Sequence, residues 1–232
     1  MLKRLRAMCW LAASVGLVGG APALAQVAPT ASEAAGYAGL HAAAHTGDLA
    51  KILALTGAGV DLNARDAHGR TALHVATFAR QPLAIQMLAK AGADLNRLEA
   101  DRYDAVTIAA VADDEDSLRT LLALGASARQ TTSRYDGTAL IAAAHLGHDG
   151  VVRQLIAAGA PLDHVNNLHW TAAIEAIVLG DGGLRHQRTL RALVDAGVNL
   201  QLTDRTGLTP LALARSRGFG AMVQMLQQAG AR

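Results

Sequence analysis

The stretch AIEAIVLGDGGLRHQRTL, residues 173 to 190, combines several groups that could carry out chemistry. Glu175 lies in an otherwise apolar run, and Arg185, His186 and Arg188 follow a glycine-rich segment. A carboxylate beside a histidine can act as an acid–base pair, and glycine-rich backbone with arginines can hold a phosphate. The structural alternative is that Glu175 fixes the segment through a charge-assisted hydrogen bond. The choice between these depends on which elements surround the stretch.

The stretch lies inside a sequence that repeats about every 33 residues, starting from an apolar anchor and ending at a glycine. The anchor-to-glycine distance is 19 residues in five units and 24 in the fifth. The anchors are Leu40, Leu73, Val106, Leu140, Ala173 and Leu211, and the glycines are Gly59, Gly92, Gly125, Gly159, Gly197 and Gly230.

The positions between these anchors repeat as well. A leucine stands four residues before each glycine, and an aliphatic residue stands seven before it, which places both on one face of a second helix. An alanine stands three residues after each anchor, where it lets neighbouring helices approach closely: Ala43, Ala76, Ala109, Ala143, Ala176 and Ala214. Glycines that could end the first helix in a left-handed conformation are Gly47, Gly147, Gly180 and Gly218.

The motifs TALHVA (71–76), TALIAA (138–143) and TPLALA (209–214) carry a resemblance to the ankyrin repeat family. This resemblance implies an all-α solenoid of about six helix-turn-helix units with β-turn fingers, over residues 34–232. Unit three departs from the pattern, because Asp104 replaces the threonine. The layout looks like the small periplasmic ankyrin proteins of Gram-negative bacteria.

Within this frame, the five extra residues of unit five fall between positions 180 and 190 and predict a decorated loop between two helices. The loop lacks the spacing of a Walker A motif. Other units hold apolar residues at the position of Glu175, so this carboxylate should be partly buried and need partners. We expect it to pin the loop through Arg185, His186 or Arg188. A metal or acid–base site around Glu175 and His186 is the alternative.

Residues 1–25 have the layout of a secretory signal peptide: a basic start, a short apolar core and ALA at 23–25 before Gln26. We expect cleavage between Ala25 and Gln26, a short linker over 26–33, and a periplasmic or secreted protein without a stable membrane span. The remaining chain would have 18 basic and 19 acidic residues and no cysteine. Its charge gives no indication of nucleic-acid binding.

Two other groups of polar residues have structural explanations. His41 with His45, and His145 with His148, are four and three residues apart and could share a metal, but two ligands make an incomplete site. In the ankyrin family, histidines at the positions of His41 and His74 make structural hydrogen bonds. The run DDED at 113–116 precedes the second helix of unit three, and carboxylates there should cap that helix.

Aromatic residues indicate where a partner would bind. Tyr37, Tyr103 and Trp170 stand just before the threonine column, in the fingers. Ankyrin proteins bind partners through their fingers and inner helices, and aromatic and arginine side chains are enriched at interfaces. The resemblance therefore implies a partner-binding face outside the repeat core with these members: Tyr37, His45, His68, Arg70, Phe78, Tyr103, Tyr135, His145 and Trp170.

The sequence thus predicts an exported, monomeric protein–protein interaction module without catalytic activity or a cofactor. The alternatives are a periplasmic stress-related helper protein, a secreted effector, or the site around Glu175 and His186.

Overall fold

The protein is described here by a computed structural model that places residues 26–232; the predicted signal peptide, residues 1–25, lies outside the described residues. A short helix, α1 (Ala31–Ala35), is followed by six pairs of antiparallel helices. The pairs are α2 (Gly39–Thr46) with α3 (Leu49–Gly57), α4 (Ala72–Phe78) with α5 (Pro82–Lys90), α6 (Ala105–Val111) with α7 (Glu115–Ala123), α8 (Ala139–Leu146) with α9 (Asp149–Ala157), α10 (Ala172–Val178) with α11 (Leu184–Asp195), and α12 (Pro210–Ser216) with α13 (Gly220–Gln228).

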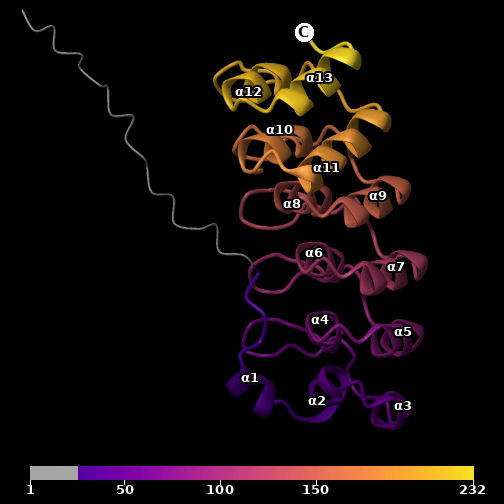
Figure 1. Cartoon of the computed structure of the whole chain (residues 1–232). Coiled ribbons are helices and arrows are strands. Elements are labelled where there is room, and N and C mark those ends of the chain that lie inside the picture. The colour runs from indigo at the N-terminus through magenta and orange to yellow at the C-terminus, as the bar shows by residue number, and fades with distance from the viewer. Residues whose placement is uncertain (1–25) are drawn as a thin grey trace, which may run out of the picture.

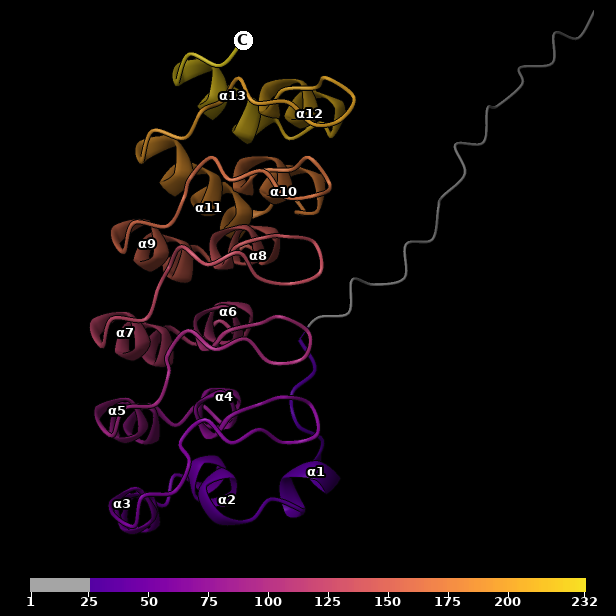
Figure 2. The ribbon, with the colours of Figure 1, turned by 180° about the vertical axis from the view of Figure 1, so that it is seen from behind.

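The pairs stack into a solenoid (Figures 1 and 2). The first helices of the pairs form one column and the second helices form the other. The connections between successive pairs project as fingers on the side of the first helices. No strand is assigned within residues 26–232, where one isolated antiparallel bridge joins Thr132 and Gly137. None of the helices in this part of the chain is long and apolar enough to cross a bilayer. The predicted all-α solenoid with fingers is confirmed.

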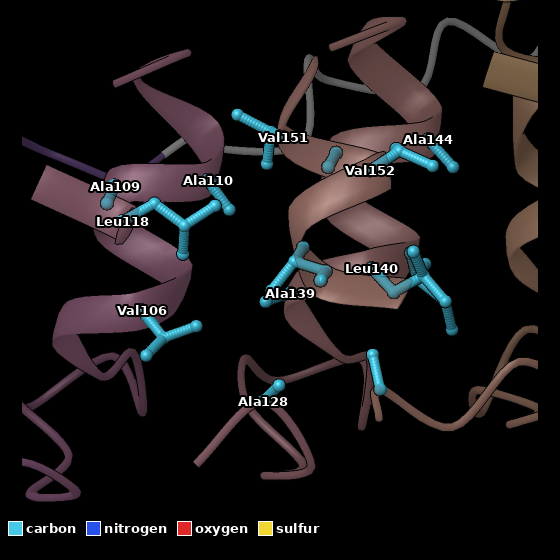
Figure 3. Close-up of a cluster of buried hydrophobic side chains, with 14 of the residues drawn as sticks. Val106, Ala109, Ala110, Leu118, Ala128, Ala139, Leu140, Ala144, Val151 and Val152 are labelled. Carbon is cyan, nitrogen blue, oxygen red and sulfur yellow. The ribbon is translucent and has the colours of Figure 1, made fainter. Parts of the chain in front are cut away.

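The core follows the repeated positions of the sequence. All six alanines of the predicted column are at most 1% exposed, and Leu88, Leu121, Leu155, Leu193 and Leu226 are fully buried. Figure 3 shows how Val106 and Leu118 of one unit face Ala139 and Val151 of the next. Each pair therefore buries its apolar face against its neighbours, and stability is built from a series of interfaces.

A side chain at the N-terminus of most first helices caps the helix. Thr138 and Thr171 accept hydrogen bonds from the backbone N–H three residues later. In unit three, Asp104 does the same, accepting from Thr107 N at 2.7 Å. Its second carboxylate oxygen accepts from Gln130, and burial raises the pKa of Asp104 above its ordinary value. The departure from the threonine pattern thus keeps the capping function. The predicted cap of α7 is also confirmed, since Asp114 accepts from Ser117 N at 3.1 Å.

The left-handed residue after the first helix is a glycine in some units only. Gly47 and Gly147 have φ of 68° and 69°, as predicted. Units two and three place Arg80 and Asp113 in this conformation instead. The prediction for Gly180 is wrong, because its backbone does not have a positive φ. Gly180 is required for another reason: a Cβ there would lie 2.1 Å from the carbonyl oxygen of Ala176.

Candidate partner-binding surface

Fingers are held in place by a side chain at their base. Asp66, Glu99, Asn166 and Asp204 each accept two backbone N–H groups of their own finger through one oxygen. Neighbouring fingers are joined by backbone hydrogen bonds, for example from Asn167 N to Tyr135 O at 3.0 Å. The side chains on the fingers are therefore presented by a rigid backbone, which lowers the ordering cost of binding a partner.

Four of the predicted partner-binding residues of units one and two form one contacting group: Tyr37, His45, Arg70 and Phe78. The Tyr37 ring lies 6.2 Å from His45, and its hydroxyl donates to Asp66 at 3.0 Å. The Arg70 guanidinium lies over the Phe78 ring at 5.8 Å. Burial raises the pKa of Asp66, but hydrogen bonds from the Arg70 backbone N–H and the Tyr37 hydroxyl outweigh this and hold it below its usual value. Asp66 is therefore ionised at neutral pH.

Two features of this group differ from the prediction. Arg70 is only 2% exposed, so it does not belong to the accessible partner-binding face. Tyr37 is half-buried and packs against the core, as does Trp170 in unit five, so these two rings are not outside the repeat core. Both rings stand where the finger meets the first helix, and part of each ring packs there against the buried core. His68, by contrast, is exposed.

Tyr103 and Tyr135 lie on the fingers of units three and four, and both are half-buried. Burial raises the pKa of Tyr103, so its hydroxyl stays protonated and can act as a hydrogen-bond donor at neutral pH. The following fingers add exposed aliphatic side chains that no motif in the sequence indicates: Val165, Leu168 and Leu208. The fingers from unit three onward therefore combine rings with exposed apolar groups.

Glu175 is buried, as predicted, but its partners are different from those predicted. Its Oε1 accepts a hydrogen bond from Asn166 Nδ2 at 2.8 Å, and its Oε2 lies 3.5 Å from Nδ1 of His145. It forms no hydrogen bond or ion pair with Arg185, His186 or Arg188, so the pinning hypothesis and the Glu175–His186 pair are both wrong. The physical reason is that Glu175 lies at the finger end of α10, whereas the extra residues follow the other end of that helix.

The five extra residues do not form only a loop. The connection from α10 to α11 has five residues where α8 to α9 has two, and α11 has 12 residues where α9 has nine. The extended first turns of α11 brace the preceding units. Arg185 donates to Asp113 at 2.7 Å and to Gly147 O at 3.0 Å, and Arg188 donates to Asp149 at 3.1 Å. Both ring nitrogens of His186 face oxygen acceptors, on Asp181 and on the backbone of His145.

Gly180 lies in the connection between α10 and this brace, and we expect Gly180→Ala to lower the free energy of unfolding by about 2 kcal/mol. The added methyl group would clash with Ala176 O and would lie 2.7 Å from the His186 ring. Urea denaturation measures the change. Gly220→Ala is the matched control, because a Cβ at position 220 meets nothing within 4 Å. Alanine favours the first turn of α13 over glycine, so this variant should raise the free energy of unfolding by about 0.5 kcal/mol. An unchanged midpoint for Gly180→Ala would show that the connection is free to move.

The histidines predicted to be structural make the expected kind of contact. His74 reaches Thr71 through one ring nitrogen and Arg97 O, at 3.0 Å, through the other, and His41 reaches Arg70 O at 3.0 Å. His148 bonds to Ala110 O at 2.9 Å, while His145 faces Glu175. In residues 26–232, no three His, Cys, Asp or Glu side chains are grouped so that they could hold a metal ion.

Known proteins share this sequence and architecture. The family described as ankyrin repeats (3 copies) matches residues 10–99 and 106–204. A protein of Escherichia coli (strain K12) named as the ankyrin repeat protein YahD is 43% identical over 86 residues, which are 37% of this chain and 43% of that protein. The chain thus spans less than half the length of this curated relative.

Solved structures extend the likeness to most of the chain. An ankyrin repeat domain from Acinetobacter baumannii AYE is 43% identical, with a TM-score of 0.79 over 83% of this chain and 98% of that one. The ankyrin repeat domain of Bcl-3, of the IkappaB protein family, is 26% identical, with a TM-score of 0.75 over 85% of this chain and 88% of that one. The chain belongs to the ankyrin repeat family, whose repeats are protein–protein interaction modules.

Proposed function

We propose that this protein is an exported, monomeric interaction module that binds another protein through the fingers of units three to six. One observation carries the proposal: rigidly linked fingers present half-buried tyrosines beside exposed aliphatic groups. The backbone carbonyl of Tyr135 accepts a hydrogen bond from Asn167 on the next finger. On that finger, Val165 and Leu168 are 42% and 36% exposed. Exposed aliphatic side chains next to tyrosine rings, which are apolar but carry a polar hydroxyl, favour binding to a protein. The proposal includes no catalytic step.

Export rests on the sequence pattern of residues 1–25. We expect the processed protein in the periplasmic fraction, with Gln26 as its first residue. Cell fractionation followed by N-terminal sequencing measures both. A protein retained in the cytoplasm with residues 1–25 intact would contradict the export part and leave the binding surface to be tested separately.

Partner binding is tested by crosslinking in periplasmic extract with the processed protein and two variants. Tyr135→Ala/Leu168→Asp alters the fingers, and we expect it to lose at least nine-tenths of a specific crosslinked partner. The matched control is Leu53→Asp/Leu83→Asp, which changes two exposed leucines, 64% and 61% exposed, on the second helices α3 and α5. Loss in the control as well, or retention in both, would contradict the assignment of the surface to the fingers.

A further inference from the structure

The segment before the first helix pair is in contact with the second finger. Figures 1 and 2 show residues 26–30 descending on the finger side of the stack to α1. Arg70 Nη2 donates to Val27 O at 3.1 Å, and Arg70 Nη1 lies 3.7 Å from Glu33 Oε1. The same carboxylate oxygen contacts the ring of His68. Although predicted as a linker, residues 26–33 thus provide a carbonyl and a carboxylate to this finger.

Arg70 is unusual among the residues at its position in the repeat. The other units place Tyr37, Tyr103, Gly137, Trp170 and Leu208 there. A guanidinium presents five donors that match carbonyl and carboxylate oxygens. Within the repeats, Arg70 Nη1 lies 3.4 Å from the Tyr37 hydroxyl and 3.6 Å from Asp66 Oδ2. The Nε atom of Arg70 is buried and has no hydrogen-bond partner within the described residues. Its remaining oxygen partners come from residues 26–33.

The contacts that hold this segment are polar and few. Helix α1 has five residues, none of them buried, and Val27 is 53% exposed. A helix of this length has little stability of its own, and a segment without buried apolar groups opens at low cost. Hydrogen bonds from Thr30, together with the charges of Arg70 and His68, lower the pKa of Glu33, so its carboxylate is ionised at neutral pH. The attachment therefore depends on charge and hydrogen bonding around Arg70.

We propose that residues 26–33 act as an internal ligand of a peptide-binding site formed by Tyr37, His68, Arg70 and Phe78. A peptide that offers a backbone carbonyl and, further along, a carboxylate can replace them. The internal segment then sets the affinity, because any external peptide must displace it. This inference rests on the proposed protein-binding function but concerns the finger of unit two, which precedes the fingers of units three to six.

The test uses the chain from residue 26 to 232 and a fluorescent peptide with the sequence of residues 26–36. Glu33→Gln in the protein removes the charge that faces Arg70 and His68 but keeps a side chain able to form the capping box with Thr30. We expect Glu33→Gln to speed amide hydrogen exchange in residues 26–35 and to tighten peptide binding at least tenfold over the unaltered chain. Ser32→Ala, at an exposed position of the same helix, is the matched control and should change neither.

Two further measurements fix the chemistry of the site. A peptide carrying glutamine in place of its glutamate should bind the Glu33→Gln protein at least tenfold more weakly than the acidic peptide. Arg70→Gln combined with Glu33→Gln should abolish binding while circular dichroism remains that of the folded protein. Equal binding of both peptides, or no binding by a Glu33→Gln protein whose segment exchanges rapidly, would overturn the inference. Crosslinking that still depends on Tyr135 and Leu168 would show that the proposed function stands without it.

Discussion

Replacing Glu175 with leucine is expected to lower the free energy of unfolding by about 2 kcal/mol, and replacing Asn166 with aspartate by about 3 kcal/mol. The first change leaves the buried Nδ2 of Asn166 without an acceptor. The second change places a buried carboxylate beside that of Glu175. In the unaltered protein, Asn166 Nδ2 and Glu175 Oε1 are 2.8 Å apart. Asn166 and Glu175 are 4% and 5% exposed, so water cannot compensate for either change.

The double variant, Asn166→Asp with Glu175→Leu, should be no less stable than the milder single variant. It recreates the combination in unit six, where Asp204 holds the finger and Leu213 stands nine residues later. The expected coupling energy is therefore about 3 kcal/mol. Chemical denaturation of all four proteins measures it. Additive losses would mean that the asparagine and the glutamate are independent and that the buried pair has another reason to exist.

The second large effect is a loss of stability in acid caused by His74. Burial lowers the pKa of His74 to about 4, from an ordinary value near 6.5. The folded protein therefore holds this ring neutral where the unfolded chain binds a proton. Stability from this group is fully present above pH 6.5 and is lost progressively as the pH falls toward 4. Over that range, the expected loss is about 3 kcal/mol.

The contribution of His74 is obtained as a difference between two pH profiles. His74→Asn keeps an acceptor for the backbone N–H of Thr71 but does not titrate. Between pH 7 and pH 4.5, the free energy of unfolding of this variant should therefore fall by about 2 kcal/mol less than that of the unaltered protein. It should be less stable than the unaltered protein at pH 7, because the bond to Arg97 O is lost. His169→Asn, at an exposed finger position with φ of 64°, should retain the full acid loss. A His74→Asn profile parallel to that of the unaltered protein would contradict this explanation.

The sequence by itself determined the repeat and its register. Leu73, Ala76 and Leu88 recur at fixed spacing because each unit packs only against its neighbours, so the same apolar positions must be buried in every unit. The burial of Glu175 followed from the same comparison, since the equivalent residues of other units are apolar. The cap of α7 was predictable for a similar reason: a capping side chain accepts from a backbone N–H only three residues later, so the capping residue and the start of the helix are visible together in the sequence.

Tertiary structure alone decided which polar groups meet. Glu175 pairs with Asn166 rather than with the inserted residues, Arg185 reaches Asp113 from 72 residues away, and Arg70 is covered by residues 26–33. None of these pairs has a repeating spacing that would reveal it in one sequence. Long polar side chains can reach many partners, and the geometry of the ends of the helices and fingers selects among them. The repeat pattern therefore determines the scaffold, whereas the polar contacts found in only one unit depend on how the irregular segments lie against that scaffold.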